Sequence, residues 1–323
     1  MKTLSWLLSR GFTVFFLSLS FVAIITLNYD ANKLLLWFLL PFYAISLALQ
    51  FFLPKIKKPL EKGELATDLI SNSVLTLVNS LQSTGLAAIF ALGSSSLLIE
   101  AGWIDPQWGL SNYAMWVQVL VGVLLLDFFF YTTHRMAHEV PMLWRFHSVH
   151  HCAHRVTFLN AYRVHPIDAM FRRFVPLFFV LLTGISEQAL VAVAVIGSVL
   201  GTITHLNMDL KHGWLNYVIG TNEVHRWHHS SKYSEAKNFS VIMIWDHLFG
   251  TYYFPKDREM PERTGLGDET NYPRHSYWQM LLLPFRWDRL KGDKNDTRIA
   301  EQSSSTDAES IQEISAAKTA DAS

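Results

Sequence analysis

The sequence predicts an all-α, polytopic membrane protein with about four transmembrane helices, a helical hairpin and a cytosolic cap rich in histidine. Of its 323 residues, 50% are hydrophobic and 14% aromatic, whereas only 17% are charged. This composition is typical of membrane proteins, and several apolar stretches are long enough to cross a bilayer as helices. The formal net charge is zero, so we expect no nucleic-acid partner.

Four apolar stretches are the candidate membrane spans. Residues 11–27 and 34–53 have the length and composition of membrane helices. The segment TLNYDANK after the first stretch lacks a small-residue cleavage pattern, so we interpret that stretch as an uncleaved anchor. Residues 69–99 are apolar but carry several polar side chains, which we expect to pack against protein. Residues 115–131 form a stronger fourth candidate.

Basic residues predict the orientation of these spans, because Lys and Arg near helix ends favour the cytoplasmic side. Lys2 and Arg10 precede the first span, and four lysines follow the second between residues 55 and 62. The loop of residues 100–112 contains two acids and no base, whereas arginines crowd the segment after the fourth span. We therefore expect a multi-pass protein of a bacterial inner membrane, with its N terminus and its histidines in the cytoplasm.

The rest of the chain divides into a hairpin, an interfacial segment and a tail. Residues 174–183 and 189–204 flank GISEQ and predict a hairpin of two helices, which either dips into the bilayer or crosses it and returns to the same side. Residues 277–287 are short, aromatic and apolar, as in segments that lie on a membrane surface. We expect N-terminal transmembrane helices over residues 1–114, a central histidine-bearing domain over 115–288 and a disordered polar tail over 289–323.

Histidines gather at regular spacings after the fourth span. The pattern HxxHH occurs in HSVHH and again in HRWHH, and HRMAH adds a pair four residues apart. Residues i, i+3 and i+4 share one face of a helix, so these imidazoles are able to converge on one or two metal ions. The clustered histidines are His134, His138, His147, His150, His151, His225, His228 and His229.

Four further residues are candidates for the same site. His205 in TITHLN ends the hairpin on the side of the clusters, and we expect it to be a ligand. His165 in RVHP is either a ligand or a residue that orients one. Asp127 inside VLLLDFFFY is expected to accept a hydrogen bond from the ring of His134, with a helix-packing hydrogen bond as the alternative. Asp246 in WDHLFGTYY either caps a turn or contacts a ligand histidine.

The number of imidazoles limits the kinds of metal site that this chain is expected to form. Zinc hydrolases use three protein ligands, and a single cysteine excludes a thiolate zinc site. Eight or more histidines are better explained by two metal ions that share about four ligands each. Beside a bilayer, a reasonable task for such a site is the activation of oxygen by iron for attack on a lipid C–H bond. A zinc-dependent membrane hydrolase, a metal transporter and a structural metal site are the alternatives.

The motifs HRMAH, HSVHH and HRWHH, together with RVHP, THLN and WDHLFGTYY, resemble the fatty acid hydroxylase superfamily, also called the sterol desaturase family. The resemblance covers about residues 115–255 and implies a membrane di-iron oxygenase. It implies hydroxylation or desaturation of a lipid such as a sterol or fatty acyl chain, or ether cleavage, with O2 and electrons from NAD(P)H. The implied iron ligands are His134, His138, His147, His150, His151, His205, His225, His228 and His229, with His165 as a further candidate.

Two features depart from the pattern of known members. Some members carry a fused cytochrome b5 domain, which this chain does not show. We therefore expect a separate electron donor, either a ferredoxin or a cytochrome b5-like protein with its reductase. Sphingolipid-type members have a second histidine four residues after the one that corresponds to His205, whereas this chain has Asp209. This difference argues against that substrate class.

Overall fold

The computed structural model describes residues 2–59, 61–91, 100–103, 107–261, 264–267 and 271–289. Within these ranges all regular elements are helical, and the β contacts are isolated bridges, so the all-α prediction is confirmed. The predicted tail from residue 290 onward lies outside the described residues. The α-helices are α1 (Lys2–Thr26), α2 (Ala31–Leu34), α3 (Leu40–Phe52), α4 (Glu64–Ala91), α6 (Met115–Glu139), α7 (Pro141–His151), α8 (Pro166–Leu181), α9 (Glu187–Thr204), α10 (Asn222–His228), α11 (Ile244–Leu248) and α12 (Tyr277–Leu282).

Short helical turns join these elements. A π-helical turn, η1 (Leu35–Leu39), makes α2 and α3 one continuous rod. The 3-10 turns are η2 (Leu110–Asn112), η3 (Leu159–Tyr162), η4 (Gly213–Tyr217), η5 (Tyr233–Glu235) and η6 (Leu283–Arg289).

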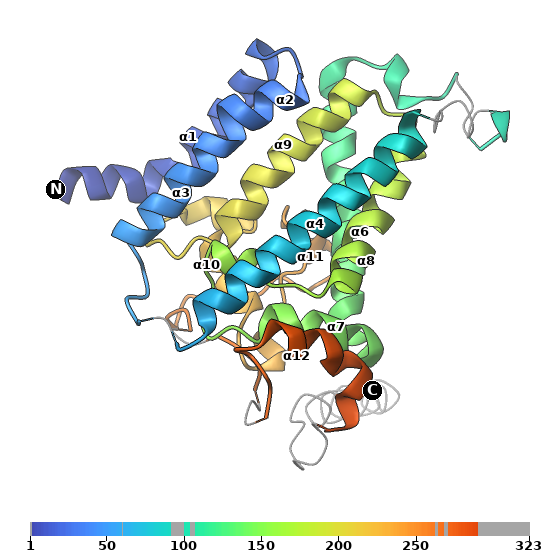
Figure 1. The fold of residues 1–323 in the computed structure, drawn as a ribbon. Helices are drawn as coiled ribbons and strands as arrows, with labels where there is room; N and C mark the ends of the chain where they lie inside the picture. Colours follow the sequence, from blue (N-terminus) through green and yellow to red (C-terminus); the bar gives the residue numbers. More distant parts are fainter. Residues whose placement is uncertain are drawn as a thin grey trace, which may run out of the picture.

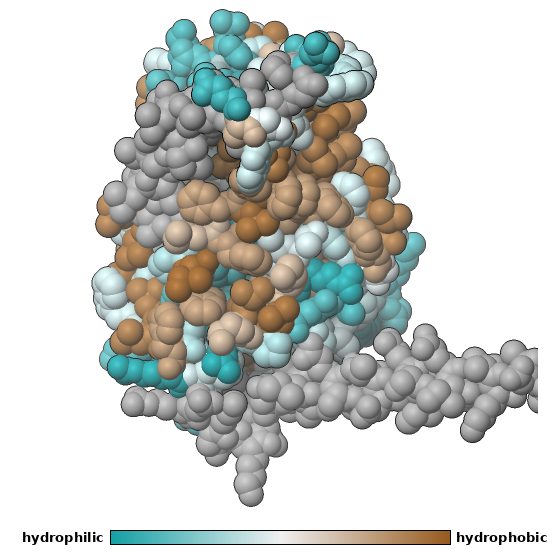
Figure 2. Space-filling model, turned by 90° about the vertical axis from the view of Figure 1, so that its right-hand side faces the viewer, coloured by the Kyte–Doolittle hydropathy of each residue, from teal (hydrophilic) through white to brown (hydrophobic). Residues whose placement is uncertain are grey.

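Four helical segments among the described residues are long and apolar enough to cross a membrane: Leu8–Thr26, Ala31–Phe52, Met115–Glu139 and Glu187–Thr204. Figure 2 shows the matching surface, a broad apolar band between two hydrophilic ends. The prediction of about four spans is therefore confirmed, although their identity differs in one place. Helix α9, the second arm of the predicted hairpin, is one of the four, whereas α4 is not. Residues 92–99, the last part of the predicted span over residues 69–99, lie outside the described residues.

Helices α6, α8 and α9 pack together behind the predicted site. Helices α8 and α9 correspond to the two helices predicted around GISEQ, and each packs on α6 (Figure 1). A Cβ atom on Gly122 of α6 would lie 2.8 Å from Ile185 and 2.9 Å from Val193. A larger residue at this position would force these side chains to move, so glycine favours the close packing of α6 on α9. The Ser186 side chain then caps α9 by accepting from the Ala189 amide.

Helices α1 and α3 cover the other side of α9. Phe12 and Phe16 of α1 are buried against Phe42 of α3, with the rings of Phe16 and Phe42 4.8 Å apart. This aromatic cluster packs on apolar residues of α9 such as Val199. In Figure 1 the short helices α7, α10, α11 and α12 lie together at one end of the long helices. These short helices and their loops form a cap, and the cap carries most of the predicted site.

Candidate metal centre

Nine of the ten predicted histidine ligands come together in the cap as two groups. One nitrogen from each histidine lies within 4.8 Å of the corresponding nitrogens in its group, and all nine side chains are buried. Group one consists of His134, His138, His147, His151 and His228. Group two consists of His150, His205, His225 and His229.

The two HxxHH motifs are interleaved between these groups. In α7, His147 and His151 are four residues apart and both point into group one, whereas His150 belongs to group two. The motif at α10 is reversed, because His225 and His229 belong to group two and His228 to group one. Each motif therefore supplies nitrogens to both groups, which the shared helix face alone did not predict.

The Nε2 atoms in group one are too close together for free neutral imidazoles. The Nε2 atom of His147 lies 3.2 Å from that of His134 and 3.1 Å from that of His151. The Nδ1 atom of His134 donates to the carbonyl of Phe239 at 2.7 Å, and that of His147 donates to the Asp168 carboxylate at 3.1 Å. A neutral imidazole has one proton, so the Nε2 atoms of His134 and His147 face each other as lone pairs. A cation between them would convert this repulsion into attraction.

Group two shows the same arrangement. The His205 Nδ1 atom donates to the Thr204 hydroxyl at 2.8 Å, and that hydroxyl donates to the Gly201 carbonyl at 2.7 Å. The unprotonated Nε2 atom of His205 then lies 3.1 Å from that of His225 and 3.3 Å from that of His150. Two nitrogens that bind one ion, each about 2.1 Å from it, are separated by about 3.0 to 3.4 Å. The residues present therefore fit a metal ion in each group.

A buried nitrogen without a partner supports the same conclusion. His228 Nδ1 donates to the Lys237 carbonyl at 2.7 Å, while its Nε2 atom is buried in group one with no hydrogen-bond partner. A buried acceptor left unpaired is costly, and coordination to a metal removes that cost. The second ring nitrogen of this histidine is thus fixed by backbone, as is common for metal-binding histidines.

Burial also keeps the rings in the form that binds metal. The pKa of His205 is lowered to about 4, chiefly by burial. Burial and then neighbouring histidines lower the pKa well below its ordinary value for five others in the cap: His150, His151, His225, His228 and His229. These imidazoles are neutral near pH 7 and need not lose a proton before they coordinate an ion.

The two groups are direct neighbours. The rings of His151 in group one and His229 in group two are stacked, with centroids 4.3 Å apart. His225 and His228 are stacked with centroids 4.9 Å apart. The structure thus places two nitrogen-rich groups side by side, at the end of an apolar helical bundle.

A family model described as fatty acid hydroxylase matches residues 119–251, the segment that contains all nine histidines. This matched segment of the chain belongs to the fatty acid hydroxylase family. The ornithine lipid hydroxylase OlsE of Rhizobium tropici is 28% identical over 225 residues, which cover 69% of this chain and 65% of that protein. Human alkylglycerol monooxygenase is 28% identical over 66% of this chain and 46% of its own length.

Fatty acid hydroxylase vlmA of a Lecanicillium species is 29% identical over 50% of each chain. The matches therefore span between about half and just under two thirds of these relatives. No solved structure matches the chain significantly.

His165 lies within the matched segment but outside both histidine groups. Its Nδ1 atom accepts from the Ile167 amide at 3.1 Å and caps α8, and its Nε2 atom donates to the Leu281 carbonyl at 3.1 Å. Both ring nitrogens therefore contact backbone, so His165 caps α8 and neither joins the two groups nor contacts a histidine through these nitrogens, unlike either role considered for it. Asp209 is likewise remote from the groups, since it is paired with Lys55 at 2.8 Å and Lys211 at 3.0 Å.

Asp127 and Asp246 support the histidines indirectly. The expected hydrogen bond from His134 to Asp127 is absent, because the His134 ring donates to the Phe239 carbonyl. Asp127 instead accepts from the amides of Val241 and Ile242, each at 2.8 Å. Asp246 accepts from the amides of residues 239 and 240, each at 2.9 Å. The two carboxylates thus hold residues 239–242, the segment that presents the carbonyl to His134.

We expect Asp127→Asn to accelerate metal loss from group one. An asparagine offers one oxygen where the carboxylate offers two, so one of the amides of Val241 and Ile242 loses its acceptor and the Phe239 carbonyl is held less firmly. The rate of metal release to a chelator should rise on the order of tenfold. The matched control is Asp30→Asn, because Asp30 also accepts from a backbone amide but caps α2. Equal release rates for both variants would contradict this role.

Asp168 is the polar residue that the sequence analysis missed. It is buried at the start of α8, accepts from His147, and pairs with Arg172 at 2.7 Å. Burial alone would raise the pKa of Asp168, but Arg172 and His147 more than offset this effect, and the pKa lies below its ordinary value. An acid and a base four residues apart at the head of an apolar helix were the available signal.

Proposed function

We propose that this chain is an O2-dependent, membrane-bound di-iron oxygenase that hydroxylates a lipid substrate. The observation that carries the proposal is the pair of interleaved groups, in which nine buried histidines from four segments present their nitrogens at coordination distances. A mononuclear zinc hydrolase needs three such ligands. A transporter would place its ligands near the bilayer midplane, whereas these histidines lie at one end of the helical bundle.

Each group would hold one iron ion, through the nine histidines named above. Bound iron would supply activation of O2 for attack on a C–H bond of the lipid. The protein's own contribution is to fix and shield the ligands. Asp168 and the backbone carbonyls of Lys237 and Phe239 set the orientation of three rings. Burial of all nine side chains excludes bulk water from the ligand nitrogens. We assign this role to residues 115–288.

The names of the relatives and the position of the site support a lipid substrate. The relatives are named for ornithine lipid, alkylglycerol and fatty acid, and the groups adjoin helices that are apolar enough to span a bilayer. A sterol or an acyl chain fits this setting equally well. Electrons would come from NAD(P)H through a separate ferredoxin or cytochrome b5-like carrier. By the positive-inside rule, the lysines near the cap end of α3 support a site on the cytoplasmic side.

The test is a comparison of lipids and metals in one experiment. A deletion strain is complemented with the wild type or with His150→Ala, and lipid extracts are compared by mass spectrometry in air and without oxygen. We expect a lipid heavier by one oxygen only with the wild type and only in air, and about two irons per purified chain. Loss of two hydrogens would reassign the reaction to desaturation. An unchanged lipid profile together with tightly bound zinc would contradict the oxygenase proposal.

A further inference from the structure

Arg226 is a buried cation without a partner. It lies between His225 and Trp227 in α10, and its side chain is 2% exposed. Its Nε and Nη1 atoms are buried and make no hydrogen bond, and no ion pair in the described part of the chain includes it. A buried guanidinium left unpaired is strongly unfavourable, so the absence of a partner among the described residues indicates an anionic ligand.

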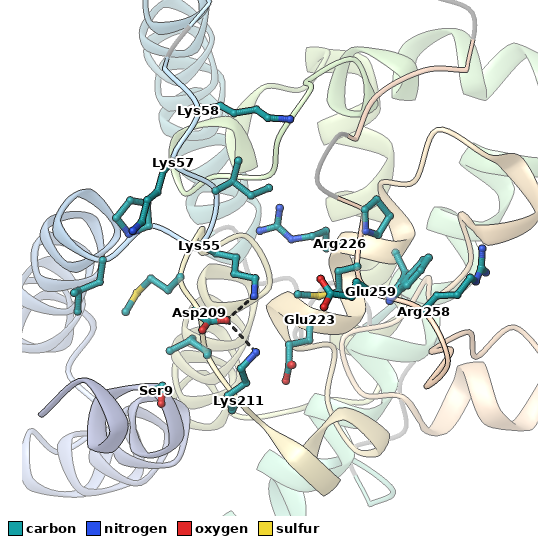
Figure 3. Close-up of a pocket in the computed structure, with 18 of the residues that line it drawn as sticks. Ser9, Lys55, Lys57, Lys58, Asp209, Lys211, Glu223, Arg226, Arg258 and Glu259 are labelled. Atoms are coloured by element: carbon teal, nitrogen blue, oxygen red, sulfur yellow. Dashed lines mark hydrogen bonds and ion pairs between the residues drawn. The ribbon is translucent and has the colours of Figure 1, made fainter. Parts of the chain in front are cut away.

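The Arg226 side chain borders a cavity of about 1200 Å³ on the side of α10 away from the histidine groups. Residues 52–59, 208–211 and 254–261 supply most of the remaining walls. Figure 3 shows the guanidinium of Arg226 directed into this space, toward the segment that carries Lys55, Lys57 and Lys58. The cavity is large enough for a lipid headgroup and the first part of its chains.

The lining of the cavity is strongly cationic. It contains seven lysines and arginines but three acids, and two of these acids already have partners. Asp209 is paired with Lys55 and Lys211, as Figure 3 shows. Glu223 accepts from the His212 amide at 2.9 Å and from the Asn216 side chain at 3.0 Å. The excess positive charge around Arg226 would attract an anion into the cavity.

The cavity also adjoins the membrane boundary. Phe52 ends α3, the second candidate span, and is 81% exposed, and Leu53 after it is 38% exposed. Leu8 at the first residue of the other N-terminal span lines the same cavity. Apolar side chains at the ends of spans, next to a cluster of lysines, are typical of sites that contact anionic headgroups. A soluble ligand would not need this apolar border.

We propose that this cavity binds the anionic group, phosphate or carboxylate, of a membrane lipid, with Arg226 as its innermost contact. A guanidinium suits both groups because its permanent charge and its N–H donors match the oxygens of phosphate and carboxylate. An acidic electron-carrier protein would contact exposed lysines but would not reach a side chain that is 2% exposed. The site is separate from the histidine groups, so this inference does not depend on the oxygenase activity.

The test measures lipid retention by the full-length, metal-loaded protein. The protein in a neutral detergent is mixed with equal amounts of phosphatidylglycerol and phosphatidylcholine of matched chains, and bound lipid is counted by native mass spectrometry. We expect the wild type to prefer phosphatidylglycerol by on the order of tenfold, and Arg226→Gln to lose most of that preference. The matched control, Lys33→Gln, removes a charge in α2, at the far end of the rod that α2 and α3 form, and should behave as the wild type. Metal content measured in the same samples separates this effect from damage to the histidine groups.

A second variant and a competitor complete the design. If Arg226→Gln does not fold, the double variant Lys57→Gln and Lys256→Gln reduces the charge at the rim of the cavity and should lower the preference several-fold. Inorganic phosphate that displaces the lipid supports recognition of the anionic group. If the protein binds phosphate but retains no phosphatidylglycerol, the cavity would be assigned to a soluble anion and the lipid proposal would be overturned. An Arg226→Gln protein with intact metal content and unchanged lipid preference would also overturn the proposal. The same holds if the cavity variants keep their lipid preference and lose only the binding of an acidic electron-carrier protein.

Discussion

His150→Ala is expected to lower the iron content from about two ions per chain to about one and to abolish lipid oxidation. Group two has four histidines, and His150 supplies one of them from α7. Its removal leaves three nitrogens and a void at a buried position. Group one keeps all five histidines, so its ion should be retained. The measurement is metal analysis of the purified protein together with turnover of the lipid that the deletion-strain comparison identifies.

The matched control for this variant is His247→Ala. His247 is an exposed cap histidine whose Nε2 atom donates to the Tyr217 carbonyl, and it belongs to neither group. Its replacement should leave two irons and normal turnover. His228→Ala gives the complementary result, since it removes a ligand from group one and leaves group two complete. A full complement of iron in both His150→Ala and His228→Ala would contradict the assignment of the groups.

The sequence predicted which histidines meet but did not predict how they divide. The HxxHH spacing places His147, His150 and His151 on one helix face, and the structure shows this face lying between two groups. His150 therefore has neighbours that differ from those of His147 and His151. The division depends on where α10 and the end of α9 lie relative to α7, and this tertiary arrangement leaves no mark in the local spacing.

The partners of the ring nitrogens were harder still to predict. His134 and His228 donate to backbone carbonyls of residues 239 and 237. Every residue has such a carbonyl, so the sequence carries no signal for this choice. Asp127 was singled out because a carboxylate inside an apolar span needs a partner. That partner is a pair of backbone amides, and the prediction therefore located the right neighbourhood but assigned the wrong contact.

The membrane spans illustrate the limit of hydropathy as a guide. Residues 189–204 were predicted as one arm of a hairpin, and α9 extends this stretch at its start to Glu187–Thr204, which is long enough to cross. Helix α4 begins with Glu64 and Asp68, which are buried in ion pairs with Arg155 and Arg163. Charged groups paired with protein explain why part of this long helix serves the cap rather than the bilayer.

Asp168→Asn is expected to release the iron of group one while that of group two stays bound. The carboxylate accepts from His147 Nδ1 in a buried contact and neutralises Arg172 in a partly buried one. The amide keeps one acceptor oxygen but no charge, so Arg172 becomes an unpaired buried cation next to His147 and the ring is less firmly oriented. Iron affinity at group one should fall on the order of 10 to 100 fold. Release to a chelator should then have two phases, one fast and one at the wild-type rate.

The second phase distinguishes positioning of His147 from a general loss of stability. A variant that merely loosens the fold would release both irons faster, whereas loss of the Asp168 contact acts on the histidines of group one alone. Asp257→Asn is the matched control, because Asp257 is exposed in the same cap and contacts neither group. Asp168→Glu, which restores the charge, should recover part of the lost affinity. A single release phase at the wild-type rate in Asp168→Asn would show that the carboxylate stabilises Arg172 only, and that His147 holds its metal without help from its other ring nitrogen.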